Sequence, residues 1–134
     1  MNHSALLAGR TGLALLFILA GVAKLGGGYA ATQGYMDAMG VPGSLLPLVI
    51  ALEIGGGLAV LAGLFTRWSA LSLAAFSVAS GVLFHFDLAD ANQFNSFFKN
   101  IAIAGGFLVL AAQGAGDYSL DRLLQRKPNR LAHA

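Results

Sequence analysis

Residues 45–65, LLPLVIALEIGGGLAVLAGLF, decide the fold of this 134-residue chain. As one helix, this stretch is long enough to cross the ~30 Å hydrocarbon core of a bilayer. It carries a single ionisable residue, Glu53, near its middle. A charged side chain at that depth costs about 2.5–3.5 kcal/mol on insertion scales and is tolerated mainly where it faces a protein interior. The stretch therefore predicts a membrane helix whose Glu53 points toward other helices.

The whole chain has the composition of a membrane protein. It is 57% hydrophobic, and only 10% of its residues are charged, against about 25% in a typical soluble domain. There is no cysteine, so the sequence offers no disulfide, thiolate metal site, iron–sulfur cluster or covalently attached haem. The length allows one compact domain.

Four apolar segments of membrane-spanning length follow one another, at residues 6–25, 45–65, 68–86 and 96–113. We therefore expect an all-α fold, a four-helix transmembrane bundle in residues 1–116. A basic cytoplasmic tail with a short amphipathic segment follows in residues 117–134. The first apolar run resembles a signal peptide, but we expect it to remain as the first helix. The segments between the spans are expected to be loops.

The loop charges predict how the bundle is oriented. Basic residues gather on one side of a four-span threading, namely Arg10, Arg67, Arg122, Arg126, Lys127 and Arg130. The acidic loop residues fall on the other side, namely Asp37, Asp87 and Asp90. Because basic residues mark the cytoplasmic side, we expect a multi-pass protein of the bacterial inner membrane with both termini cytoplasmic.

The tail after residue 116 is expected to contact lipid and not nucleic acid. Ser119 is placed to cap a short helix with Leu120, Leu123 and Leu124 on one face. Such a helix would lie on the cytoplasmic membrane surface. A solvated basic tail without a specific partner is the alternative.

Five polar side chains fall inside or at the ends of the apolar segments, namely Lys24, Glu53, His85, Lys99 and Asn100. The predicted orientation places all five in the outer half of the membrane. Two interpretations stay open. In one, Glu53 pairs with Lys24 or Lys99 and only holds the bundle together. In the other, the five residues line a pocket for a small ligand or a proton path, because a histidine exchanges protons near neutral pH.

The residues around these five side chains do not decide between the structural ion pair and the ligand pocket. Five phenylalanines surround the outer ends of the last two spans, namely Phe84, Phe86, Phe94, Phe97 and Phe98. They are either membrane-interface aromatics or a stacking wall for a planar ring such as a quinone. The spacing of the nearby acidic residues and His85 matches no metal-binding motif, so no metal is predicted. No residue is assigned a catalytic role.

An ordered set of residues points to a family. It comprises Arg10, Gly21, Lys24, Glu53, Gly56, Gly57, Gly63, Thr66, Arg67, the Phe84-His85-Phe86 segment, Asn95, Lys99, Asn100, Gly114, Gly116, Ser119, Leu120 and Asp121. In this order the chain resembles the DoxX family of small four-helix membrane proteins over nearly its whole length. The resemblance implies a redox-linked membrane role, since some members are subunits of thiosulfate:quinone oxidoreductases and others associate with oxidative-stress enzymes.

These observations support two hypotheses about function. In the first, the chain is a subunit or accessory of a membrane redox system, and its outer-half pocket binds a quinone-like or other small molecule. Glu53 and His85 would exchange protons there, with Lys99 and Asn100 as anchors. In the alternative, the chain is a non-catalytic adaptor or assembly protein whose buried charges are structural. The expected partners are the lipid bilayer and either a redox enzyme subunit or a second copy. A transporter is disfavoured because no inverted repeat is visible.

Overall fold

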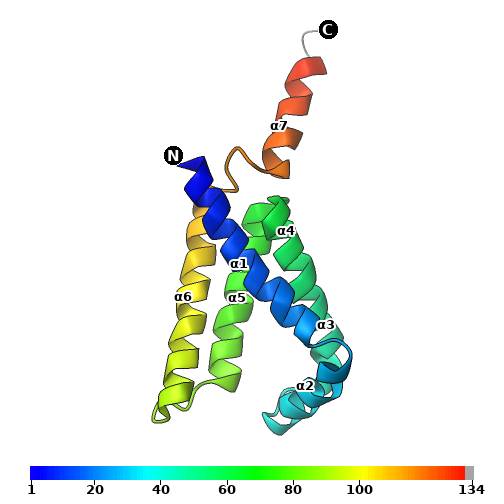
Figure 1. Cartoon of the computed structure of the whole chain (residues 1–134), viewed down its shortest axis with the longest axis vertical. Helices are drawn as coiled ribbons and strands as arrows, with labels where there is room; N and C mark the ends of the chain where they lie inside the picture. The colour runs from blue at the N-terminus through cyan, green and yellow to red at the C-terminus, as the bar shows by residue number, and fades with distance from the viewer. Residues whose placement is uncertain (132–134) are drawn as a thin grey trace.

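The computed structural model describes residues 1–131, and all regular secondary structure in that range is helical. Four segments are long and apolar enough to cross a membrane: α1 (His3–Ala23), the composite segment Gly43–Ala62, α5 (Thr66–Phe84) and α6 (Ala91–Gln113). The predicted all-α fold with four spans is therefore confirmed. In Figure 1 the N-terminus and α7 (Leu120–Leu131) lie at one end of the bundle, and α2 (Gly27–Ala38) lies at the other.

The second span is built from four short pieces. They are η1 (Gly43–Leu45), α3 (Leu46–Ala51), the π-helical turn η2 (Leu52–Gly56) and α4 (Gly57–Ala62). Pro47 stands in the first turn of α3, where its missing N–H breaks no helical hydrogen bond. The span ends at Gly63, whose φ of 69° is left-handed. The sequence pattern predicted the span but not the π turn inside it.

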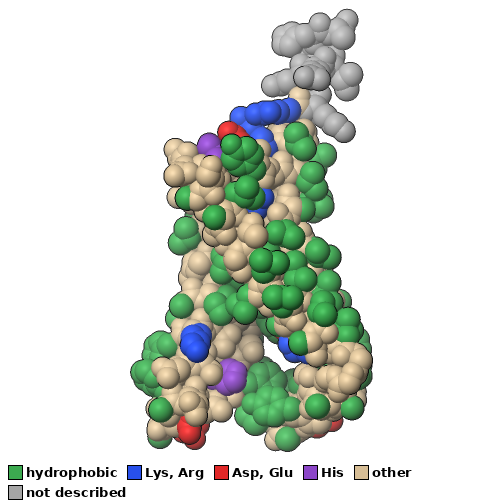
Figure 2. Space-filling model, viewed as in Figure 1, with side chains coloured by type: hydrophobic (Ala, Val, Ile, Leu, Met, Phe, Trp, Pro, Cys, Tyr) green, Lys and Arg blue, Asp and Glu red, His purple; other side chains and the backbone are tan. Residues whose placement is uncertain are grey.

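The core lies at the crossing of α1, α4, α5 and α6. The Phe17 ring of α1 meets the Phe107 ring of α6 edge to face, with their centroids 5.4 Å apart. Around this pair pack small residues and branched apolar side chains, namely Ala14, Val60, Ala70, Leu73, Ala74, Ala104, Leu110 and Ala111. Small side chains let membrane helices approach closely. The outer faces remain apolar, as Figure 2 shows along the sides of the bundle, and they suit contact with lipid.

The helix α2 corrects the expectation that residues 26–44 form a loop. It runs between Gly26 and Gly40, whose φ angles of 59° and 78° turn the chain at either side of it. Met36 of α2 is buried against Leu46 and Ile50. The Tyr35 ring stacks on Phe84 of α5, with their centroids 5.6 Å apart. α2 thus packs on the second span at the end of the bundle opposite the N-terminus and reaches α5 through Tyr35.

At the other end, hydrogen bonds tie the segment after α6 to the first and third spans. Arg10, buried in α1, donates from Nη1 to the carbonyl of Ala115 and from Nη2 to that of Tyr118, each at 2.6 Å. The Asp121 carboxylate accepts from the amides of Phe65 at 2.8 Å and Thr66 at 3.0 Å. These bonds cap the start of α5. We call this set of contacts the terminal latch.

Asp121 is held ionised by the terminal latch. Burial alone would raise its pKa, but the amide hydrogen bonds from Thr66 and Phe65 and the nearby Arg10 charge outweigh burial and hold the pKa below its usual value. Ser119 accepts from the Arg122 amide at 3.3 Å and caps α7, as expected. Beyond it, α7 projects past the end of the bundle (Figure 1). The predicted tail residues at 127–134 have side chains outside the described part of the chain.

Candidate functional site

The candidate site begins with the backbone around Glu53. This residue lies on the π turn η2, and π turns inside α-helices are frequent at functional sites. Glycines allow the turn to approach α1 closely. A Cβ on Gly21 would lie 2.6 Å from Ile54 Cγ1, and a Cβ on Gly57 would lie 2.8 Å from Ile18 Cγ1. The close approach places Glu53 beside the end of α1.

Glu53 forms an ion pair with Lys24, which follows α1 directly. The Lys24 Nζ donates a hydrogen bond to Oε1 of Glu53 at 3.0 Å. It lies 2.9 Å from Oε2, an ion-pair contact that is poorly aligned for a hydrogen bond. Nζ also donates to the carbonyl of Ala20 at 3.2 Å. The predicted pairing of Glu53 with Lys24 is confirmed.

The two partners differ in their access to water. The side chain of Glu53 is only 5% exposed, whereas that of Lys24 is 24% exposed. Oε2 of Glu53 is fully buried and receives no hydrogen bond from the described residues. Buried polar groups are nearly always hydrogen-bonded. The Lys24 ammonium, 2.9 Å from Oε2, is therefore the group that offsets the burial of this oxygen.

A pocket of about 420 Å³ lies beside this ion pair, between α2, the second span and α5. Figure 2 shows the molecule hollowed at this end. The walls of the pocket are mostly apolar and aromatic, with a few polar groups. They are formed by Lys24, Thr32, Tyr35, Met36, Val41, Leu45, Val49, Glu53, Phe76, Ala79, Ser80, Leu83, Phe84 and His85. Binding sites for small molecules commonly have a volume of this size and a mostly apolar lining with a few polar groups.

Three of the five predicted site residues line the pocket, namely Lys24, Glu53 and His85. The His85 Nδ1 lies 3.0 Å from Oε1 of Gln93, which holds the imidazole ring in place. The site thus draws one polar group from each of the first three spans or their ends. A second hollow, lined by Tyr35, Phe84 and Gln93 among others, adjoins the pocket toward the acidic loop.

The structure does not bring Lys99 and Asn100 to the pocket. Lys99 is exposed, and Asn100 packs against Gly81 and donates to the carbonyl of Ser96 at 3.0 Å. The prediction that Lys99 and Asn100 anchor a ligand requires both side chains to point into the bundle. The buried face of α6 instead carries Ala104, Phe107, Leu110 and Ala111, because the core needs small and apolar side chains there.

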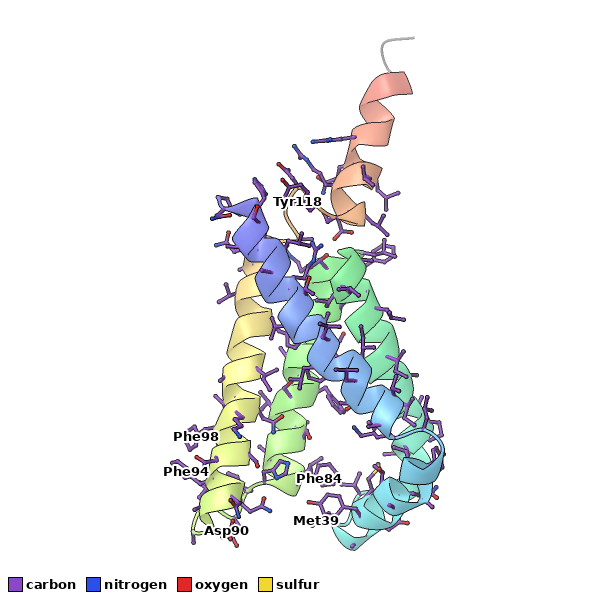
Figure 3. All side chains as sticks on the ribbon, viewed as in Figure 1. Met39, Phe84, Asp90, Phe94, Phe98 and Tyr118 are labelled. Atoms are coloured by element: carbon purple, nitrogen blue, oxygen red, sulfur yellow. The ribbon has the colours of Figure 1, made fainter. Side chains whose placement is uncertain are left out.

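Most of the five phenylalanines also lie away from the pocket. Figure 3 shows Phe84 pointing toward α2, whereas Phe94 and Phe98 point away from the bundle. Phe94 and Phe98 pack on each other, with their centroids 4.7 Å apart. Phe86 and Phe97 form a similar edge-to-face pair at 5.5 Å. Only Phe84 among these five lines the pocket, so the outer group suits a membrane-interface belt.

The pocket residues that α2 supplies were not predicted from the sequence. Thr32 and Tyr35 were placed in a loop. The glycines around residues 26–28 concealed the helix, although Tyr29 and Met36 stand seven residues apart and pack on the same apolar cluster. That spacing, two turns of a helix, is the signal that indicates α2.

Comparison with known proteins identifies the family. Residues 5–86, which include Lys24, Glu53 and His85, match the family model described as DoxX. The chain belongs to the DoxX family. Inner membrane protein YqjF of Escherichia coli (strain K12) is 55% identical to it over 113 residues, which cover 84% of this chain and 86% of that relative. Inner membrane protein YphA of the same strain is 35% identical over 125 residues, covering 87% of this chain and 88% of the relative. No solved structure gives a significant match.

This DoxX chain is therefore an integral inner-membrane protein. Its four apolar spans and its two inner-membrane relatives agree on this point. Within the described residues, no group of three or more histidines and carboxylates is arranged to hold a metal ion. The polar groups on the pocket wall are one carboxylate, one ammonium, one imidazole and hydroxyl groups.

Proposed function

We propose that this DoxX protein binds a small planar ring of the quinone class in the pocket beside Glu53. It would do so as a membrane-embedded subunit or accessory of a redox system. One observation carries the proposal. A mostly buried ion pair, built on a π turn, lies at the wall of a pocket of ligand size that aromatic rings line.

Aromatic walls favour a planar ligand. Tyr35, Phe76 and Phe84 line the pocket from α2 and α5, and aromatic rings pack well by offset stacking or edge-to-face contact. Lys24 has three N–H donors, of which two are used by Glu53 and Ala20. The exposed part of the Lys24 side chain would bring the ammonium within reach of an oxygen substituent on the ring.

The redox part of the proposal rests on the family resemblance. The position of His85 at the pocket wall supports a redox role, because an imidazole can pass protons between the ligand and water. In the orientation predicted from the positive-inside rule, this end of the bundle would lie on the outer side of the inner membrane. A ligand would therefore enter from the outer leaflet or the periplasm.

The test is thermal stabilisation of the purified protein by a panel of short-tailed quinones. A ligand at a hundredfold excess over its Kd stabilises the folded state by about 2.7 kcal/mol. We expect this stabilisation in the wild type and its loss in folded Glu53→Ala and His85→Ala variants. Lys99→Ala, a change outside the pocket, is the matched control and should keep it. No stabilisation in the wild type, or an equal shift in the pocket variants, would favour the adaptor function instead.

A further inference from the structure

The end of the molecule that carries the terminal latch exposes large apolar side chains. Leu120, Leu123 and Leu124 of α7 are 41%, 56% and 51% exposed. Phe65 and Trp68, at the start of α5, are 66% and 71% exposed. Only the three leucines belonged to the predicted amphipathic segment. We call these five residues the apolar end patch.

The terminal latch holds the two parts of the apolar end patch together. The Asp121 carboxylate, in the first turn of α7, accepts hydrogen bonds from the amides of Phe65 and Thr66. These bonds fix the start of α7 beside the start of α5. Figure 2 shows hydrophobic side chains along one side of α7 and along the adjoining side of the bundle. The patch therefore adjoins the apolar faces that suit contact with lipid.

The opposite side of α7 is polar. At about 100° per residue, Arg122 and Gln125 project away from the three leucines, and Figure 2 shows basic side chains on that side. Among the described side chains, this end carries four arginines against two carboxylates, namely Arg10, Arg67, Arg122, Arg126, Asp117 and Asp121. Helices with leucines on one face and basic residues on the other bind at the bilayer interface. Anionic headgroups complement such a net positive surface.

The level of the apolar end patch also fits a bilayer. Phe65 and Trp68 lie at one end of the third span, and aromatic residues of membrane proteins are enriched at the headgroup level. Leu120 and Leu124 are four helical steps apart, a rise of about 6 Å. The headgroup layer on each side of the hydrocarbon core is about 5–7 Å thick. The five side chains therefore fit within that layer.

We propose that the apolar end patch binds the headgroup layer of the bilayer, and that the arginines at this end favour anionic lipids. In the orientation predicted from the positive-inside rule, this surface is the cytoplasmic leaflet. The proposal does not depend on the ligand of the pocket beside Glu53, which lies nearer the other end of the molecule. A second copy of the chain and a soluble protein are the rival occupants.

The chain supplies its own reporters for the test. Trp68 is its single tryptophan, and it has no cysteine that would compete for a label. The full-length protein is placed, one copy per disc, in nanodiscs of phosphatidylcholine with or without phosphatidylglycerol. A lipid with a spin label at its headgroup tests contact with Trp68. A fluorophore on Leu123→Cys reports the apolar face of α7, and the same fluorophore on Gln125→Cys is the matched control on the polar face.

We expect the spin-labelled lipid to quench both Trp68 and the fluorophore at residue 123. Iodide in the water should quench the fluorophore at residue 125 more strongly than that at 123. One arginine near an anionic surface changes the binding equilibrium about fivefold. Arg126→Gln should therefore lower the ratio of lipid-bound to water-exposed α7 about fivefold in the anionic discs, and Lys99→Gln, at the other end, should leave it unchanged.

Three results would overturn the proposal. Equal access of iodide to both positions, with Trp68 unaffected by the spin-labelled lipid, would leave the patch to a soluble partner. The Trp68 measurement needs no substitution, so it stands where a cysteine variant folds poorly. Protection of residue 123 only in discs with two copies would assign the patch to a second copy. Equal protection with and without phosphatidylglycerol, unchanged by Arg126→Gln, would refute the selection of anionic lipids.

Discussion

The ion pair between Lys24 and Glu53 makes a quantitative prediction about stability. Lys24→Met leaves a carboxylate whose side chain is 5% exposed without its counter-ion. Breaking a buried pair in this way costs about 3–5 kcal/mol. Glu53→Gln leaves an ammonium that is 24% exposed and still donates to Ala20. We expect that change to cost less, about 1–2 kcal/mol.

The double variant decides whether the two charges are coupled. With both charges removed, no buried ion remains, and we expect a loss of about 2–4 kcal/mol, below the sum of the single losses. The shortfall of about 2–3 kcal/mol is the coupling energy, within the range for residues in contact. Unfolding in mixed micelles with rising sodium dodecyl sulfate, followed by circular dichroism of the helices, measures each value.

Lys99→Met is the control for removing a lysine from the chain. Lys99 is exposed, so its loss should change the free energy of unfolding by less than about 0.5 kcal/mol. Additive losses in the double variant would refute the reasoning, because they would mean that neither charge responds to the other.

Three further predictions concern other parts of the molecule. Gly21→Ala should lower stability in the same unfolding assay by about 1–3 kcal/mol, because its Cβ would meet Ile54 at 2.6 Å, whereas Gly12→Ala, with open space around it, should not. The lowered pKa of Asp121 means that its stabilising contribution is complete above the ordinary value near ~3.9 and is lost as the pH falls through the native pKa. Unfolding midpoints should therefore drop more steeply below about pH 4 in the wild type than in Asp121→Asn, and parallel curves would contradict this. Reporter fusions after residue 40 and at the C-terminus should report opposite sides of the membrane, and the same side for both would overturn the four-span topology.

The four spans were predictable because the length of an apolar run is a local property of the sequence. The ion-pair partner of Glu53 was predicted to be Lys24 or Lys99, because a charge at membrane depth needs a counter-ion. To identify Lys24 and not Lys99 as this partner, one must know which face of α6 points into the bundle. The packing of the core determines that face. The small residues near Ala104 and Ala111 must face α5 and α1, so Lys99 turns outward.

Other features depend on contacts between distant segments. The π turn at Glu53 has no clear local signal, because it depends on how closely the glycines of α1 and the second span approach each other. Helix α2 is rich in glycine and short, so its stability comes from packing of Met36 on the second span. Arg10 was interpreted as an orienting charge at the cytoplasmic end. Its partners are carbonyls more than a hundred residues away along the chain, and spacing rules do not reach that far.

The terminal latch also has a consequence for how the protein is made. Arg10 emerges from the ribosome early, but the carbonyls that satisfy it belong to Ala115 and Tyr118. All four spans therefore enter the membrane before this arginine meets its partners. The Asp121 cap on α5 likewise requires residues that follow the fourth span in the sequence. A chain cut short before residue 115 would lack these two carbonyls and leave the Arg10 guanidinium without the acceptors that it has in the complete bundle.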